Sequence, residues 1–161
     1  KENIFSNTKG TKMSNKILSY RGLLADGGQD TILLSTKKGE VGYRITKFEL
    51  MPNEPGEDQH ESTVMIWKDF QSTIDNTVDF SNNRLLACSI WQSGNAPGGA
   101  DALWVPHTSI FDQEIFNQDV YVTHSETDGS NPINYYIEIE VIKLDESQAM
   151  VATLKDIRNN S

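Results

Sequence analysis

The sequence is poor in cysteine: Cys88 is the single one among 161 residues. One cysteine cannot form an internal disulfide, so no disulfide framework holds this fold together. A chain of this length predicts one domain whose hydrophobic core is large enough to be stable without such cross-links.

Long hydrophobic runs are also missing. The longest apolar stretches, at 22–25 and 64–67, are far too short to cross a bilayer, so we expect no membrane partner. Residues 1–15 lack the apolar central run of a secretory signal peptide, and we expect none.

Positive charge is scarce outside the first sixteen residues. The net charge is −9, but residues 1–16 hold four lysines against Glu2, a charge of +3, which leaves −12 for the remainder. A body this acidic repels phosphate backbones, so we expect no nucleic-acid partner. Its acidity equally serves solubility.

The basic segment 1–15 is predicted to be an extended polar arm before a single domain at 16–161. Two interpretations stay open. Short polar termini are usually mobile tails. Alternatively, the arm docks on an acidic surface of a neighbouring chain, with Ile4 and Phe5 as its apolar anchors.

Helical periodicity is absent until the last residues, and the alternation typical of β-strands fills the rest. The strand candidates are separated by turn residues at intervals of about 8–12 residues. They lie at 17–25, 30–36, 41–51, 62–68, 85–92, 102–106, 119–124 and 133–144. This pattern predicts an all-β fold, an antiparallel, jelly-roll-like β-sandwich of about eight strands.

The alternation changes phase inside one long candidate strand, 41–51. Tyr43 and Ile45 alternate, and the apolar positions then shift to Phe48 and Leu50. Such a shift predicts a β-bulge.

Two other segments make further predictions. The alternation in 85–92 places Leu86, Cys88 and Ile90 on one face. In 133–144, the residues expected on one face are Ile133, Tyr135, Ile137, Ile139 and Val141.

The chain closes on the one helical pattern, which predicts a short C-terminal α-helix at 146–158. Asp145 and Gln148 have the spacing of a capping box, and Leu154 and Ile157 belong to an apolar stripe. A helix this short is not stable alone in water. Leu154 and Ile157 are therefore expected to be buried, either on an open end of their own sandwich or in a subunit interface.

The three histidines are candidate metal ligands by residue type. A cupin places two histidines one residue apart on a strand, whereas His60, His107 and His124 are each isolated, and His60 falls in an acidic loop at 52–61. The segment 125–131 is rich in oxygen ligands but lacks a calcium-loop pattern, so it predicts a hairpin turn on Asp-Gly. We therefore expect no metal and no cofactor.

The three tryptophans, Trp67, Trp91 and Trp104, allow two interpretations. They form either a sugar-stacking platform or, as is commoner in β proteins of this size, core or interface residues. No nucleophile elbow, phosphate loop or cysteine–histidine motif occurs, so no catalytic residue and no enzyme class is predicted.

In three C-terminal segments the sequence resembles small virion proteins of marine tailed bacteriophages. These segments are Leu103–His124, Asn134–Glu140 and Ala152–Arg158. The resemblance is strongest over 41–160. It implies a jelly-roll structural protein in a virion, of the capsid-decorating or capsid-stabilising type. Its implied partners are other virion proteins and copies of itself, as a homo-oligomer within the particle.

Two alternatives come from other classes. One is a carbohydrate- or receptor-binding module, from a tail fibre or lectin-like, that uses exposed tryptophans and the loop at 93–101. The other is a cupin-like metalloenzyme, which needs the three histidines to converge. Burial of the tryptophans and the placement of the histidines test these alternatives.

Overall fold

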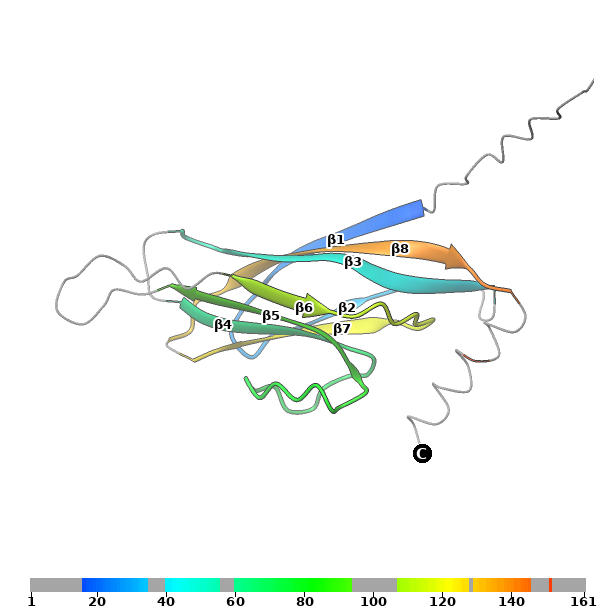
Figure 1. Ribbon diagram of the computed structural model, residues 1–161. Coiled ribbons are helices and arrows are strands. Elements are labelled where there is room, and N and C mark those ends of the chain that lie inside the picture. Colours follow the sequence, from blue (N-terminus) through cyan, green and yellow to red (C-terminus); the bar gives the residue numbers. More distant parts are fainter. Residues whose placement is uncertain are drawn as a thin grey trace, which may run out of the picture.

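The computed structural model describes residues 16–34, 40–55, 60–93, 107–127, 129–145 and 151. In these ranges the chain forms eight β-strands, which lie in two facing layers (Figure 1). The strands are β1 (Lys16–Leu24), β2 (Gln29–Ile32), β3 (Val41–Pro52), β4 (His60–Trp67), β5 (Leu85–Ser93), β6 (Thr108–Phe111), β7 (Val120–Glu126) and β8 (Ile133–Lys143).

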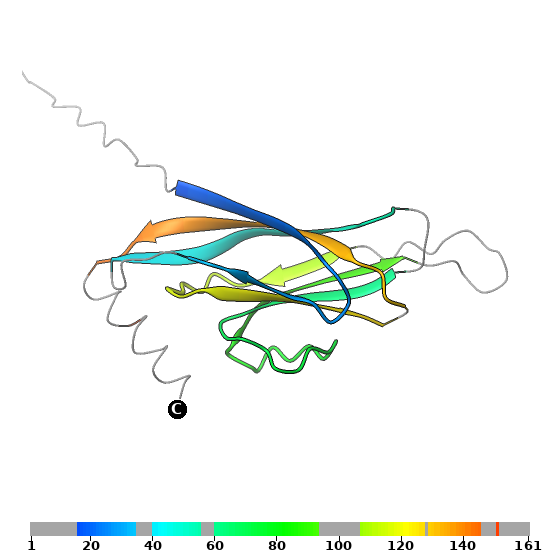
Figure 2. The same cartoon turned by 180° about the vertical axis from the view of Figure 1, so that it is seen from behind.

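The strands are divided between two antiparallel sheets. The three-stranded sheet has the order β1-β8-β3, and the five-stranded sheet has the order β2-β7-β4-β5-β6. The view from behind shows the same two layers, with β1 at the border of the smaller one (Figure 2). The prediction of an all-β, antiparallel, sandwich-like fold is confirmed.

The main core lies between the two sheets. On β8 the predicted alternation is confirmed, because Ile133, Ile137 and Ile139 are fully buried while Glu138 between them is not. Strands β4 and β7 contribute the facing residues, Val64, Ile66, Val120 and Val122. Their burial follows the period of two that strand geometry imposes.

The bulge predicted in 41–51 is also confirmed. The pairing of β3 with β8 shifts between Ile45 and Lys47. Because Thr46 is the extra residue, both Ile45 and Phe48 face the core, at 2% and 1% exposure.

The prediction that Leu86, Cys88 and Ile90 share one face of β5 is wrong. The β4–β5 register shifts between Ile66 and Trp67, and this irregularity puts Leu86 into the main core. Cys88 and Ile90 belong instead to a second apolar cluster, which we call the outer cluster, together with Met65, Trp67, Leu85, Val78 and Tyr121. The connection at 68–84 lies over this outer face of the five-stranded sheet (Figure 1).

Two loop predictions also need correction, and one strand was not predicted. The segment 125–131 is not a hairpin turn, because β7 and β8, which it joins, belong to different sheets. His60 is not in a loop: it begins β4 and is 4% exposed. Strand β6 was missed, since its four residues at Thr108–Phe111 are too few to establish a period.

Several predictions fall on residues outside the described ranges. These are the arm at 1–15 with Ile4 and Phe5, the strand at 102–106, and the helix at 146–158, of which Val151 alone is described. They stay predictions, as does the burial of Leu154 and Ile157. In the described part of the chain, no helix has the length and apolar character of a membrane span.

Candidate functional site: two histidine clusters and a surface hollow

The fold collects the three histidines into two separate clusters. His60 and His124 come together because β4 and β7 are neighbouring strands. His107 lies just before β6, the border strand of the same sheet that is next to β5. Sequence spacing could not reveal the first pairing, which joins positions 64 residues apart.

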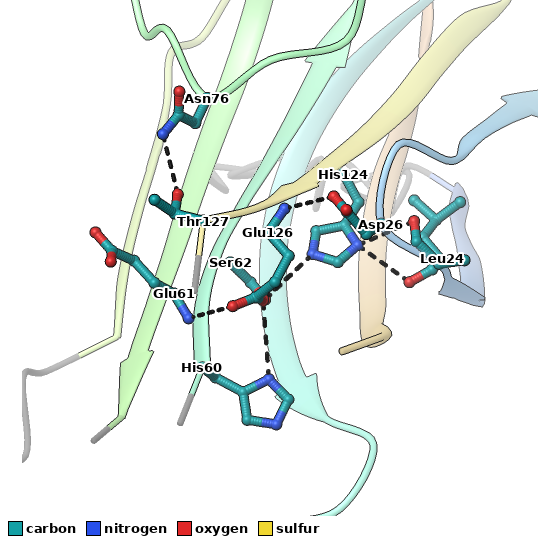
Figure 3. A network of polar contacts seen from close by, with 10 residues as sticks. Leu24, Asp26, His60, Glu61, Ser62, Asn76, His124, Glu126 and Thr127 are labelled. Atoms are coloured by element: carbon teal, nitrogen blue, oxygen red, sulfur yellow. Dashed lines mark hydrogen bonds and ion pairs between the residues drawn. The ribbon is translucent and has the colours of Figure 1, made fainter. Parts of the chain in front are cut away.

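The first cluster is a buried polar network between β4 and β7 (Figure 3). Ser62 and Glu126 are register partners, and so are Val64 and His124. The Ser62 hydroxyl lies 2.5 Å from Glu126 Oε2 and 3.1 Å from His124 Nε2. It has one proton, which it can donate to only one of the two at a time.

The other side of the His124 ring is fixed by the turn between β1 and β2. His124 Nδ1 lies 3.1 Å from the carbonyl oxygens of both Leu24 and Ala25. Since carbonyls only accept, Nδ1 carries the proton and a neutral ring leaves Nε2 as an acceptor. Asp26 Oδ1 accepts the backbone N–H of Glu126 at 2.8 Å, which ties the same turn to β7.

Burial controls the chemistry of this network. It lowers the pKa of His124, and the nearby carbonyls together with the carboxylates of Glu126 and Asp26 offset this only in part. His60 Nδ1 lies 4.0 Å from Glu126 Oε2, and no described residue gives it a hydrogen bond. Glu126 Oε1 is held by the Glu61 N–H at 2.7 Å.

We interpret the network as a structural clamp. The side chains of Ser62, His124 and Glu126 are closed to solvent and join β4, β7 and the turn after β1. Within the described ranges, no group of three or more His, Cys, Asp or Glu side chains is arranged to hold a metal ion. The three histidines do not converge, which removes the geometric basis of the cupin-like alternative.

The second cluster joins the two sheets at the other border. His107 Nε2 lies 2.8 Å from Ser89 Oγ and 3.1 Å from Ser109 Oγ, and the two hydroxyls are 2.7 Å apart. His107 Nδ1 lies 3.5 Å from Glu49 Oε2, on β3 of the three-stranded sheet.

The order carboxylate, imidazole and hydroxyl in this cluster is also that of a hydrolytic triad. A serine nucleophile must meet its substrate; Ser89, which makes the shortest contact with His107, is fully buried, whereas Ser109 is half-buried and bonds to the Ser89 hydroxyl as well as to the ring. We interpret this cluster as a polar link between the sheets.

The two described tryptophans lie on opposite faces of the five-stranded sheet. Trp67 is 8% exposed, belongs to the outer cluster and donates its Nε1–H to Thr123 Oγ1 at 3.0 Å. Trp91 packs on the main core and lies against the His107 ring, with the ring centres 5.7 Å apart. These two residues therefore do not form one exposed platform, and Trp104 lies outside the described residues.

A hollow of about 800 Å³ lies on the outer face of the three-stranded sheet, where sequence reasoning proposed no site. We call it the hollow over Gly22, after one of its lining residues. Tyr136 also lines it, and Lys47 Nζ lies 5.6 Å from the centre of the Tyr136 ring. The lining residues are Arg21, Gly22, Leu23, Lys47, Glu49, Leu50, Met51, Asn134, Tyr135 and Tyr136. Most of its lining residues alternate with the buried residues along β1, β3 and β8, and this alternation is the one sign of the hollow in the sequence.

Comparison with known proteins does not assign the chain to a family. No protein-family model matches the chain, and no curated protein matches it.

Proposed function

We propose that this protein is a virion structural subunit of a tailed bacteriophage, of the capsid-decorating or capsid-stabilising type, and that it acts through protein–protein contacts. The observation that carries the proposal is the outer face of the three-stranded sheet. Three large apolar side chains stand exposed there, Ile17 at 50%, Leu23 at 51% and Met51 at 63%. Leu23 and Met51 both pair with Asn134 of β8 and so flank it, whereas Ile17 lies toward the other end of β1. Neighbouring exposed apolar side chains are typical of protein contact sites.

The finer fold that we propose is a jelly roll, as the sequence resemblance implies. In that fold two sheets of four interleave consecutive strands, and the pairing β1-β8-β3 against β2-β7-β4-β5 follows this order. The departure is β6, which pairs with β5. Just after β6, however, Phe116 forms a bridge with Tyr43 of β3, which is the neighbour that a jelly roll requires.

The C-terminal helix and the N-terminal arm belong to the same proposal. We propose that 146–158 form a helix that buries Leu154 and Ile157, and that the arm at 1–15 contacts another chain through Ile4 and Phe5. Both devices suit a subunit whose body is acidic and does not face packaged DNA.

The proposal is tested on particles encoded by the genome that carries this sequence. Mass spectrometry of purified particles should find the chain in multiple copies, and immunogold labelling should place it on the capsid. Labelling of tails or fibres alone would contradict capsid decoration. Absence of the chain from purified particles would contradict a virion role altogether.

A second candidate, a carbohydrate- or receptor-binding module, is favoured by the hollow over Gly22. Its tyrosine ring, the cations Arg21 and Lys47 and the amide of Asn134 are groups that stack on and hydrogen-bond to sugars. Glycan-array binding that is lost in Tyr136→Ala and kept in Phe80→Ala, an exposed aromatic elsewhere, would support this function. No binding to any glycan would count against it.

A further inference from the structure

The two sheets have four border strands, and three of these have protected edges. Strands β2 and β6 have four residues each. Strand β3 is interrupted by its bulge and is bridged at Tyr43, whose N–H and carbonyl bond to Phe116 at 2.7 Å and 3.0 Å. Short strands, bulges and covering segments are the usual protection against pairing with other chains.

Strand β1 has none of these protections in the part of the chain that the structure describes. It runs for nine residues without proline, and its register with β8 is unbroken from Lys16 to Leu24. Among the described strands, β8 is its one partner. Along its other edge, alternate residues therefore present backbone N–H and carbonyl groups that are free to pair.

We propose that β1 pairs antiparallel with β1 of a second copy of this chain, so that the two three-stranded sheets join into one sheet of six strands. The inference deepens the proposed function, on whose self-association it rests, by naming the surface and the register. Symmetric pairing of a strand with its own copy is a common closed arrangement, because one patch serves both subunits.

The register follows from symmetry and from the period of two. Facing residues must lie on the same side of the joined sheet. Full pairing of Lys16–Leu24 then places the two-fold axis at Tyr20, opposite Tyr20 of the second copy. In this register Ile17 faces Leu23, Leu18 faces Gly22, and Ser19 faces Arg21.

The side chains of β1 are complementary in this register. Ile17 and Leu23 are both half exposed, and they would meet twice, once on each side of the axis. Such apolar cross-strand pairs stabilise antiparallel sheets. No charged residue of the strand directly faces another.

In the proposed dimer Arg21 also has a carboxylate, Glu138, within reach. Ser19 is the register partner of Glu138 on β8, so Glu138 lies one strand beyond Ser19 on the same outer face. Because Ser19 is short, Arg21 of the second copy has room to reach over it toward this carboxylate. The core-facing residues Leu18 and Tyr20, which are half-buried in one chain, gain cover from the added strand.

A disulfide trap tests both the pairing and its register. In the proposed register the Cα atoms of facing residues are about 4.5–5.5 Å apart, within the span of a disulfide. The double variant Ile17→Cys/Leu23→Cys should form a covalent dimer on mild oxidation. Within one chain these two positions are about 20 Å apart and cannot bond. The native Cys88 is buried and does not compete.

The matched register control is Ser19→Cys/Leu23→Cys, whose cysteines would face each other only after a shift of two residues. It should give little covalent dimer. Equal cross-linking of both variants, or none in the first, would overturn the proposal.

Mass in solution provides the second test. Sedimentation of the full chain over a concentration series should show a reversible equilibrium between 18.1 kDa monomers and dimers. Ile17→Lys or Leu23→Lys should shift it toward monomer by about tenfold or more in Kd, whereas Leu33→Lys, which changes a 70% exposed apolar side chain just after β2, should not. A chain that is monomeric throughout would overturn the pairing.

These tests use the isolated chain, so they are separate from the test of the virion role. A trapped dimer that is absent from purified particles would contradict the proposed function and leave the edge pairing intact. A protein found on capsids that gives no register-specific cross-link would do the reverse.

Discussion

His124 is the residue whose environment makes the clearest prediction about pH. Burial lowers the pKa of its ring below the ordinary value near 6.5, so an unfolded chain takes up a proton there before the folded one does. The free energy of unfolding should therefore fall as the pH drops below about 6.5. Above this pH the ring is neutral in both states and contributes no slope.

The measurement is the midpoint of urea unfolding at about pH 7.5 and about pH 5.5. His124→Gln removes the titrating group and keeps an amide that can reach Ser62, so its stability should depend less on pH over this interval. A variant with the same pH dependence as the native chain would contradict the assignment.

Cys88 makes a second prediction at this scale. Burial in the outer cluster raises the pKa of its thiol to about 11. Since the thiolate is the reactive form, a disulfide reagent at about pH 8 should label the folded protein far more slowly than the urea-unfolded chain. Rapid stoichiometric labelling of the folded protein would show that the outer cluster, including its cover at 68–84, opens readily.

At the scale of elements, Gly22 lies where the two sheets are tied together. The Tyr135 hydroxyl of β8 donates to Asp30 Oδ2 of β2 at 2.9 Å, across the sandwich. A Cβ on Gly22 would lie 2.8 Å from the Tyr135 ring and 2.9 Å from that carboxylate. Gly22→Ala should thus lower the free energy of unfolding by about 1–3 kcal/mol.

Chemical denaturation measures this cost, with Ser19→Ala on the exposed face of the same strand as its control. If displacement of Tyr135 is the cause, the same Gly22→Ala change should cost less in a Tyr135→Ala background, which lacks the ring that the new Cβ would meet. A full cost in both backgrounds would place the clash elsewhere.

Some features of the strands could be predicted from the sequence and others could not. The β8 alternation and the β3 bulge were predictable because burial follows the period of two, and a change of phase locates the extra residue. The bulge between β4 and β5 left no such sign, because apolar residues line both faces of 85–88. The face of Cys88 was therefore predicted wrongly.

The candidate sites were harder to predict, because they depend on which strands are neighbours. His60 and His124 share Glu126 only through the β4–β7 pairing, and Glu49 meets His107 only across the two sheets. One sequence carries no sign of these long-range pairings. The hollow over Gly22 likewise needs three strands to be placed before its lining exists.

At the scale of the whole molecule, the edge of β1 and the arm that precedes it are proposed to make different contacts, the first with a second copy and the second with another chain of the particle. Deletion of residues 1–12 distinguishes them. All described strands begin at Lys16 or later, so the shortened chain should keep the circular dichroism and unfolding midpoint of the full one.

The β1 dimer should also survive this deletion, because its contacts lie within Lys16–Leu24. Binding to capsids should weaken, since a net charge of +2 and the apolar anchors Ile4 and Phe5 are lost with residues 1–12. Exposed ion pairs alone stabilise by about 0–1 kcal/mol, so Phe5→Ala should reproduce much of the loss, whereas Lys9→Ala should have little effect. Co-sedimentation of the shortened chain with capsids measures the result. If it binds as tightly as the full chain, the arm is only a tail and does not contribute to capsid binding.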